Sequence, residues 1–564
     1  MNGAAARNHL PRQLVVALTI PAVAFFSLFY AWPVVALVRR AVTVDSLRTV
    51  IGDRSLREIL WFTTWQAALS TALTVVVAMI PAWVLSRYEF TGRRWITALV
   101  TVPFVLPTVV VGAAFLALLP SSLGQSVTAI LAAHVFFNIA VVVRGVGGLW
   151  EQIPSDLAAA ARTLGASPWR TMREVTLPLL TPAIAASASI VFLFTFTSFG
   201  VVRILGGPAH PTIEVEIWQR ATRFGDVGVA AVISIAQVIV LGLAVLWFTR
   251  IQSRHRQTLG LRPANQRRHP RGWRQATAVR ATCAVIVVLI CAPLAALVER
   301  STRADAGKHS LTAWRSVFGS HPPGSVRQTP ATSIDPLGSV FTSLRFMIVA
   351  VLLSLVIGGC ASLAIAALGR SGRVLDTGIM LPLGTSAVTI GFGLVVAFST
   401  RPFDWRAAPL LIPLGHAMVA TPFVVRVLLP TLRSIDPRLR DAAAALGASP
   451  ARAWREIDLR LVRGPLLTAA GFAAAISLGE FGATTFLTRQ GRATLPIAIE
   501  QLLGRPGTVL HAQGYVLATI LAALTFAVIA LVELARGLVD DRPRRADTRQ
   551  HRSVDVRRPR ARTS

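Results

Sequence analysis

Glu480 is the residue whose chemical type and setting most clearly indicate a functional site in this sequence. It lies inside the apolar segment SLGEFGATTFL. A carboxylate at membrane depth is energetically costly and faces a bundle interior or water, which is typical of a solute pathway or gate. A structural bond to a neighbouring helix would explain the residue equally well. Ser198 stands 282 positions earlier in the similar segment FTSFGVV, so a pathway built from both would be asymmetric.

His134 and His416 form a second pair with the same spacing of 282 positions. Imidazole is a common metal ligand, but two histidines without supporting carboxylates are a poor site for iron. They could line a pathway, and we favour a structural role. No nucleophile and base stand in a catalytic pattern, so we predict no metal site and no catalytic residue.

The sequence also lacks a phosphate-binding motif. In GxxxxGK[ST], backbone amides and the lysine surround phosphate groups. The single lysine, Lys308 in ADAGKHS, lacks the first glycine of that motif and the following Ser or Thr. We therefore expect that the chain is not an enzyme and has no cofactor of its own. If transport is active, a partner ATPase must bind ATP and Mg²⁺.

Composition places these residues in a membrane. Hydrophobic residues make up 53% of the 564 residues and charged residues only 15%, and the mean hydropathy is +0.59. The net charge of +31 comes from arginines between apolar runs and in the C-terminal segment, as the positive-inside rule expects. We therefore predict a multi-pass cell membrane protein with both termini cytoplasmic, in contact with lipid rather than nucleic acid.

Apolar runs long enough to cross a bilayer recur along the whole chain, since about 20 helical residues suffice. The predicted fold class is an all-α integral membrane protein with about twelve transmembrane helices. The predicted spans are residues 14–38, 60–85, 96–119, 127–149, 182–205, 228–250, 279–298, 340–368, 374–399, 408–432, 465–487 and 512–536.

The two halves of the chain are an internal repeat. LGASP occurs at 164–168 and again at 446–450, and the Phe-Gly pair at 199–200 recurs at 481–482, all with an offset of 282. Duplicated six-span units occur in transporters, with a pathway at the repeat interface. The predicted domains are a first unit, 1–250 (core about 58–250), a basic linker, 251–278, a second unit, 279–537 (core about 338–535), and a basic, disordered tail, 538–564.

Each LGASP lies in a polar loop between the fourth and fifth predicted span of its half. Ser155 and Asp436 are expected to N-cap a short alanine-rich helix in each loop. Gly165 and Gly447 are expected to end that helix with a positive φ, and the following Ser-Pro pair restarts the chain as a helix. A small-sided helix held in this way is suited to a groove in another protein.

These loops resemble the EAA loop of type I ATP-binding-cassette (ABC) importer permeases. The second loop matches with an aspartate in the glutamate position, and the first loop lacks the acidic residue. The resemblance assigns ATPase coupling to Ala159, Ala160, Ala161, Gly165 and Pro168 in the first loop and to Asp441, Ala442, Ala443, Gly447 and Pro450 in the second.

The resemblance covers almost the whole chain and implies a fused two-core permease of the ferric-iron and thiamine branch. It implies cytoplasmic ABC ATPase subunits, two copies in number, and an extracytoplasmic solute-binding protein that delivers a small solute for alternating access. Ferric iron and thiamine remain equal alternatives as the solute. A gradient-driven secondary transporter with duplicated six-span halves is the rival interpretation, and it predicts more ionisable residues inside the spans.

The segment 205–220 follows the fifth span of the first half on the predicted outer side. Its two acidic residues, Glu214 and Glu216, could meet basic residues of a binding protein. A solvated loop without a partner would show the same charges.

Overall fold

The computed structural model shows an almost entirely helical chain, which confirms the predicted fold class. In the described residues the only β-type pairing is an isolated bridge between Tyr88 and Arg268. The structure describes residues 12–41, 44–254, 267–303, 309–319, 334–369, 371–399, 404–405, 408–489 and 491–540. Lys308, most of the predicted tail and residues 255–266 of the predicted linker lie outside them.

The first half contains a series of helices interrupted by π-helical turns, labelled η. They are α1 (Arg12–Phe26), η1 (Ser27–Ala31), α2 (Trp32–Ala41), α3 (Val44–Gly52), α4 (Arg54–Arg87), α5 (Arg93–Val105), α6 (Thr108–Leu118), α7 (Ser121–Gly124), α8 (Val127–Gln152), α9 (Ser155–Thr163), α10 (Pro168–Thr171), η2 (Met172–Thr176), α11 (Leu177–Phe196), α12 (Gly200–Leu205), α13 (Ile213–Thr222) and α14 (Val227–Arg254).

The second half repeats this order, with a 3-10 turn as η3. Its elements are α15 (Gly272–Ser301), α16 (Thr312–Val317), α17 (Pro336–Leu368), α18 (Gly372–Met380), η3 (Leu381–Gly384), α19 (Ala387–Ala397), α20 (Leu411–Ser434), α21 (Pro437–Ala445), α22 (Pro450–Ala453), η4 (Trp454–Asp458), α23 (Leu459–Gly479), α24 (Gly482–Leu487), α25 (Leu495–Leu503) and α26 (Thr508–Asp540).

Ten helices in the described part of the chain are long and apolar enough to cross a membrane, or up to twelve if each of two bent pairs is one span. The bent pairs coincide with the predicted spans 96–119 and 374–399, and the sequence interpretation did not indicate the bends. α5 and α6 meet at 103°, and α18–η3 and α19 meet at 101°.

The two bends have different local causes. In the first half, Leu106 precedes Pro107, and a residue before proline is disfavoured in the helical region; both residues are extended, with ψ of 139° and 136°. In the second half, the side chain of Ser386 caps α19 and accepts a hydrogen bond from the Val388 N–H at 3.1 Å. The repeat has therefore kept the bend while changing the residues that make it.

The fifth predicted span of each half is also broken. α11 ends at Phe196 and α12 begins at Gly200, whereas α23 ends at Gly479 and α24 begins at Gly482. The predicted continuous spans 182–205 and 465–487 were therefore wrong at their outer ends, where the short helices α12 and α24 turn to pack on α6 and α19.

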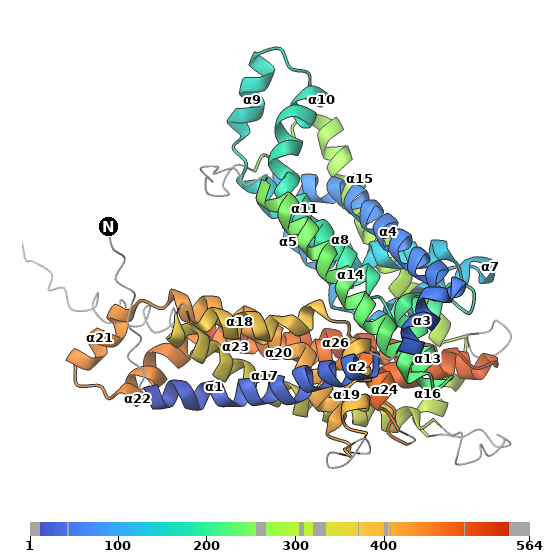
Figure 1. The fold of residues 1–564 in the computed structure, drawn as a ribbon. Helices are drawn as coiled ribbons and strands as arrows, with labels where there is room; N and C mark the ends of the chain where they lie inside the picture. The colour runs from blue at the N-terminus through green and yellow to red at the C-terminus, as the bar shows by residue number, and fades with distance from the viewer. Residues whose placement is uncertain are drawn as a thin grey trace, which may run out of the picture.

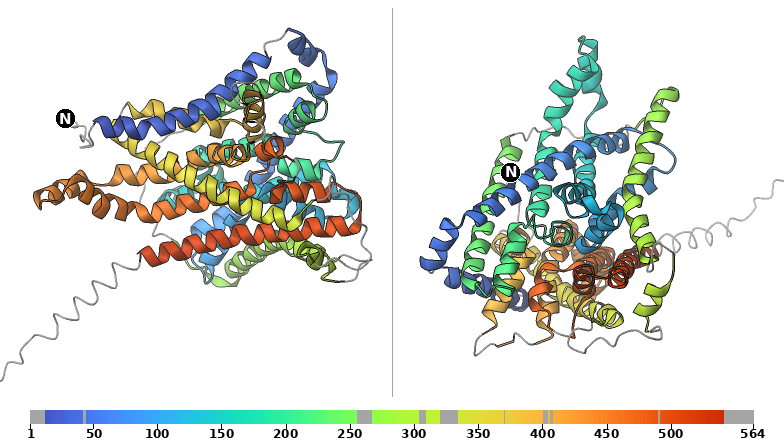
Figure 2. Two further views of the ribbon diagram at one scale, coloured as in Figure 1. Left: turned by 90° about the horizontal axis from the view of Figure 1, so that it is seen from below. Right: turned by 90° about the vertical axis from the view of Figure 1, so that its right-hand side faces the viewer.

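Figure 1 shows two helical arms that diverge from a common region containing α13 and α24. α9 lies at the far end of one arm and α21 at the far end of the other. The arms exchange their outermost helices: α1 packs on α17 of the second half, and α15 packs on α5 and α6 of the first. Figure 2 shows α1, in blue, lying along the helices of the second half. The predicted domain boundaries follow chain order and do not describe this exchange.

Candidate functional site

The two LGASP loops have the same backbone geometry. Gly165 has a φ of +85° and Gly447 a φ of +80°, the left-handed conformation that glycine adopts at little cost. The Ala166 N–H donates to the Ala161 carbonyl at 3.0 Å, and the Ala448 N–H donates to the Ala443 carbonyl at 2.9 Å. These are the long hydrogen bonds of a Schellman ending, so both predicted helix stops are confirmed.

The beginnings of the two short helices differ. Asp436 caps α21 as predicted, because its carboxylate accepts from the Arg438 N–H at 2.9 Å. Ser155 is not the N-cap of α9: it is the first helical residue, and the cap position is Pro154, whose side chain has no acceptor. At the restart, Pro168 and Pro450 begin α10 and α22. The repeat therefore fixes the end of each short helix more closely than its start.

Leu164 and Leu446 are the most exposed large apolar side chains of the two loops. They are 88% and 89% exposed, directly before the positive-φ glycines. α21 has no buried residue at all. Two apolar side chains presented in the same way are suited to insertion into a partner surface. The sequence interpretation concentrated on the alanines and glycines and missed these leucines, although LGASP contains both.

A buried ion pair between Arg440 and Asp458 ties the second loop to its arm. The Arg440 guanidinium donates from Nε to both Asp458 oxygens, at 3.1 and 3.0 Å, and also from Nη2. These hydrogen bonds raise the pKa of Arg440 above its ordinary value. Ala158 and Thr176 occupy the corresponding positions 282 residues earlier, so the first loop lacks this pair.

The broken spans of the two halves meet at the centre of the molecule. Phe199 and Phe481, repeat equivalents, stack with ring centroids 5.0 Å apart and an interplanar angle of 25°. Each phenylalanine is followed by a glycine, Gly200 or Gly482. Because glycine has no side chain, the first residues of a neighbouring helix can approach closely. A Cβ on Gly482 would lie 3.1 Å from the Val388 nitrogen, and one on Gly200 would collide with Thr108.

A cavity of about 320 Å³ adjoins this stacked pair and is lined by residues of both halves. Ser198, Glu480 and His134 line it, as expected of pathway residues, whereas His416 does not. The cavity walls also contain phenylalanines that the sequence interpretation missed. Their spacing gave no signal, because phenylalanine in a membrane span is ordinary.

Glu480 has a structural contact as well as a position on the cavity. The side chain is 8% exposed, and its Oε1 accepts from the Ala483 N–H at 2.8 Å, so it caps α24. Both roles considered from the sequence are therefore compatible with its geometry.

The two histidines have different surroundings. Both nitrogens of His416 are within 2.8 Å of hydroxyls, Nδ1 of Ser477 and Nε2 of Thr484. His134 Nδ1 lies 3.1 Å from the Ser70 hydroxyl, and its Nε2 has no partner among the described residues. His416 therefore bonds the fourth span to the fifth, and His134 leaves one nitrogen unused beside the cavity.

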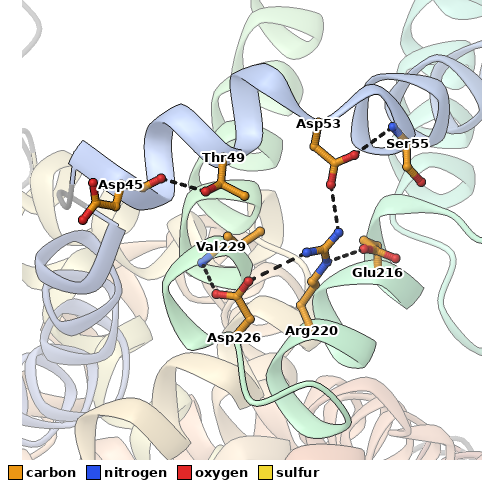
Figure 3. A network of polar contacts seen from close by, with 8 residues as sticks. All are labelled: Asp45, Thr49, Asp53, Ser55, Glu216, Arg220, Asp226 and Val229. Carbon is orange, nitrogen blue, oxygen red and sulfur yellow. Dashed lines mark hydrogen bonds and ion pairs between the residues drawn. The ribbon is translucent and has the colours of Figure 1, made fainter.

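The acidic residues of α13 are internal, which corrects the expectation that they contact a binding protein. Glu214 is fully buried and its Oε2 accepts from the Ser386 hydroxyl of the second half at 2.7 Å. Glu216 accepts from Arg220 at 2.7 Å, and Arg220 also binds Asp53 at 3.0 Å (Figure 3). The hydrogen bond to Glu216 is the main reason that the pKa of Arg220 is raised. This network fixes α13 to the start of α4.

An ion pair crosses between the halves beside the stacked rings. Arg203 of α12 binds Glu500 of α25 with 2.7 Å between Nη2 and Oε1, and its guanidinium lies 4.3 Å from the ring centroid of Trp218. Trp218 is the repeat equivalent of Glu500, whereas Thr485 is the equivalent of Arg203. The contact therefore exists once, not twice, in the molecule.

The family described as "Binding-protein-dependent transport system inner membrane component" matches the chain twice, over residues 74–257 and 350–545. The first segment begins within α4 and the second within α17, the corresponding helices of the two halves.

Curated relatives match the chain over most of its length. The thiamine transport system permease protein ThiP of Escherichia coli strain K12 is 27% identical over 521 residues, which cover 87% of this chain and 91% of that protein. ThiP of Brucella abortus strain 2308 is 29% identical over 511 residues, which cover 86% and 88%. The probable ABC transporter permease protein y4fN of Sinorhizobium fredii is 24% identical over 517 residues, which cover 87% and 89%.

Proposed function

Because this chain belongs to the family of binding-protein-dependent transport system inner membrane components, we propose that it is the thiamine permease of an importer driven by a separate ATPase. Both halves of the single chain match the family, so it is a fused two-core permease. The resemblance to type I ABC importer permeases is thus confirmed.

Thiamine as the solute is supported by the names of the relatives, which cover most of the chain. Ferric iron, the other expected solute, has no such support. In the described parts of the chain, no three or more His, Cys, Asp or Glu side chains come together in a way that could hold a metal ion. A thiamine-type cargo also suits a pathway lined by phenylalanines more than by metal ligands.

The twin loops carry the proposal for ATP-driven transport. Each ends a short helix in the same Schellman geometry and exposes a leucine, Leu164 or Leu446, at its tip. We infer that each loop docks in one of two cytoplasmic ATPase subunits, which places the loops and both termini in the cytoplasm. A solute-binding protein would then deliver thiamine to the opposite face.

The arms suggest how ATP could drive alternating access. α9 and α21 lie at the far ends of arms that meet near the stacked phenylalanines (Figure 1). If ATP binding brings two docked ATPase subunits together, the arm ends approach and the central contact opens toward the binding protein. A near-complete switch between two states needs about 5.5 kcal/mol of differential affinity, so the ATPases must bind ATP much more tightly in one state.

The test is thiamine uptake by proteoliposomes that contain the permease with its co-purified ATPase, supplied with binding protein and radiolabelled thiamine. We expect uptake only when ATP is present on the side of the vesicle membrane where the two loops lie. Proteoliposomes with the permease alone should take up none. Uptake that persists without the ATPase and stops when ionophores remove ion gradients would instead establish the secondary-transporter interpretation.

A further inference from the structure

The central cavity has the size and position of a small-molecule site. Its volume of about 320 Å³ falls at the lower end of the range found for ligand pockets, about 300–1,000 Å³. Residues of both halves line it, including the stacked pair Phe199 and Phe481. A solute that passes between the halves must therefore pass this cavity.

One wall of the cavity is aromatic and comes from the first half. Phe104 packs 5.7 Å from both Phe137 and Phe194, measured between ring centroids. All three rings line the cavity. At the repeat-equivalent positions the second half presents the aliphatic residues Leu383, Val419 and Ile476, although its Phe423 and Phe472 also line the cavity. Aromatic faces attract organic cations and stack on flat rings, and aliphatic side chains do neither.

The charged group of the cavity comes from the second half. Glu480 is a carboxylate where the first half has Ser198. Its bonds are to backbone N–H groups of α24, and no basic side chain pairs with it among the described residues. A buried negative charge is stabilised by a nearby cation. Among the described residues, no cationic side chain pairs with Glu480 in this way.

Hydrogen-bonding capacity also remains unused in the cavity wall. Asn138 and His134 both line the cavity, and Asn138 Oδ1 and His134 Nε2 are buried without a partner in the described structure. The second half has no such unused atoms at the equivalent positions. Ala420 replaces Asn138, and Nε2 of His416 is hydrogen-bonded to the Thr484 hydroxyl. Buried polar atoms normally have partners, so a ligand that donates an N–H to Asn138 Oδ1 and forms a hydrogen bond with His134 Nε2 would complete this wall.

We propose that the cavity binds a planar organic cation directly, with its charged ring between the first-half phenylalanines and the Glu480 carboxylate and its hydrogen-bonding groups toward Asn138 and His134. The inference rests on the proposed function and deepens it, because thiamine carries a positive thiazolium ring and an aminopyrimidine. The permease itself then selects the solute, in addition to the binding protein.

The test is equilibrium dialysis of the permease–ATPase complex in lipid nanodiscs, without binding protein, against radiolabelled thiamine. The second probe is deazathiamine, in which carbon replaces the charged ring nitrogen. We expect the wild-type complex to bind thiamine at least about tenfold more tightly than deazathiamine, a difference that charge recognition readily provides. This comparison needs no variant and is insensitive to folding defects.

Three variants assign the selectivity to residues. Glu480→Gln keeps an acceptor for the cap of α24 but removes the charge, and should abolish the preference for thiamine over deazathiamine. Phe137→Val places the second-half residue in the first half and should weaken thiamine binding about fivefold. Glu58→Gln is the matched control, because it makes the same chemical change at an exposed carboxylate that does not line the cavity, and its affinity should stay within about twofold of wild type.

The outcomes separate this inference from the proposed function. If the wild-type complex takes up thiamine with ATP and binding protein but shows no direct binding, or binds both probes equally, the cavity site is refuted and the importer stands. The same holds if Glu480→Gln keeps the preference. If ATP-dependent thiamine uptake itself fails, the proposed function is refuted.

Discussion

At α9 and α21 the two halves are nearly interchangeable, whereas at the central cavity they differ. Both loops close on a positive-φ glycine and expose a leucine at the tip. In the cavity wall, Phe137 of the first half corresponds to Val419 of the second, and Ser198 corresponds to Glu480. The contacts expected to receive force have stayed alike, because two identical ATPase subunits would need two identical docking sites. The cavity is asymmetric because a solute without twofold symmetry gains nothing from a symmetric wall.

The largest effect should follow from breaking the two loop glycines. Gly165→Val and Gly447→Val place a β-branched residue at a positive φ, which costs about 3 kcal/mol of strain although no atom lies within 4 Å of either added Cβ. Each change should reduce ATP-dependent thiamine uptake by about a hundredfold, and the two should be equally severe. Asn at the same positions tolerates this conformation and should keep most uptake; severe loss with Asn would point to a role other than backbone geometry.

Removing the buried ion pair should affect one loop only. Arg440→Ala leaves the Asp458 carboxylate, which is 3% exposed, without its hydrogen bonds, at a cost of about 2 kcal/mol. Hydrogen exchange measured by mass spectrometry should become faster in 437–448 and unchanged in 155–166. Equal acceleration in both loops would show that the first loop depends on the second. Ala158→Arg together with Thr176→Asp tests whether the pair can be installed in the first half.

The exposed leucines should matter for the partner and not for the fold. Leu164→Ser and Leu446→Ser each remove an apolar side chain worth about 1.5 kcal/mol when buried, so the affinity for the ATPase should fall about tenfold per loop. Surface plasmon resonance with the purified ATPase measures this, and the melting temperature of the permease alone should not change. Trp169→Ser, which removes another exposed apolar side chain of the first loop, serves as the comparison. An equal loss of ATPase affinity in this variant would show that the two leucines have no special role in docking.

The smallest effect should come from replacing the stacked rings of Phe199 and Phe481, which join the two halves. Phe199→Leu and Phe481→Leu each remove an aromatic pair worth about 1 kcal/mol, so the closed central contact should open about fivefold more often. ATP hydrolysis without binding protein should rise by a similar factor in both variants. Different responses of the two would show that this contact is not shared equally by the halves.

Much of the fold followed from local sequence features. The apolar runs identified the membrane helices because burying an unpaired backbone in lipid is prohibitive. Gly165, Gly447 and Asp436 fixed their helix ends as predicted, since capping depends on a few adjacent residues. The bends at 105–108 and 384–387 were missed because a bent span has the same composition as a straight one. Ser155 was misplaced by one position, since Pro154 occupies the cap position and Ser155 is already the first helical residue.

The candidate site was only partly accessible from the sequence. Glu480, Ser198 and His134 could be named from the sequence as possible pathway residues, because polar residues in apolar spans are few, and all three line the cavity. The phenylalanines and Asn138 could not, since their number and spacing are ordinary for membrane helices. Glu214 was expected at the surface and is buried, because a short amphipathic segment does not reveal which neighbour will cover it.

By itself, the sequence determined the membrane class, the duplication and the closure of the two loops, since periodicity and capping act within about one or two helical turns. Only the tertiary structure decided that α1 and α15 change arms, that Phe199 meets Phe481, and that aromatic and acidic residues share one cavity. These relations join residues more than 150 positions apart. They arise from how whole helices pack, and packing depends on the shapes of surfaces that no short segment of the chain contains.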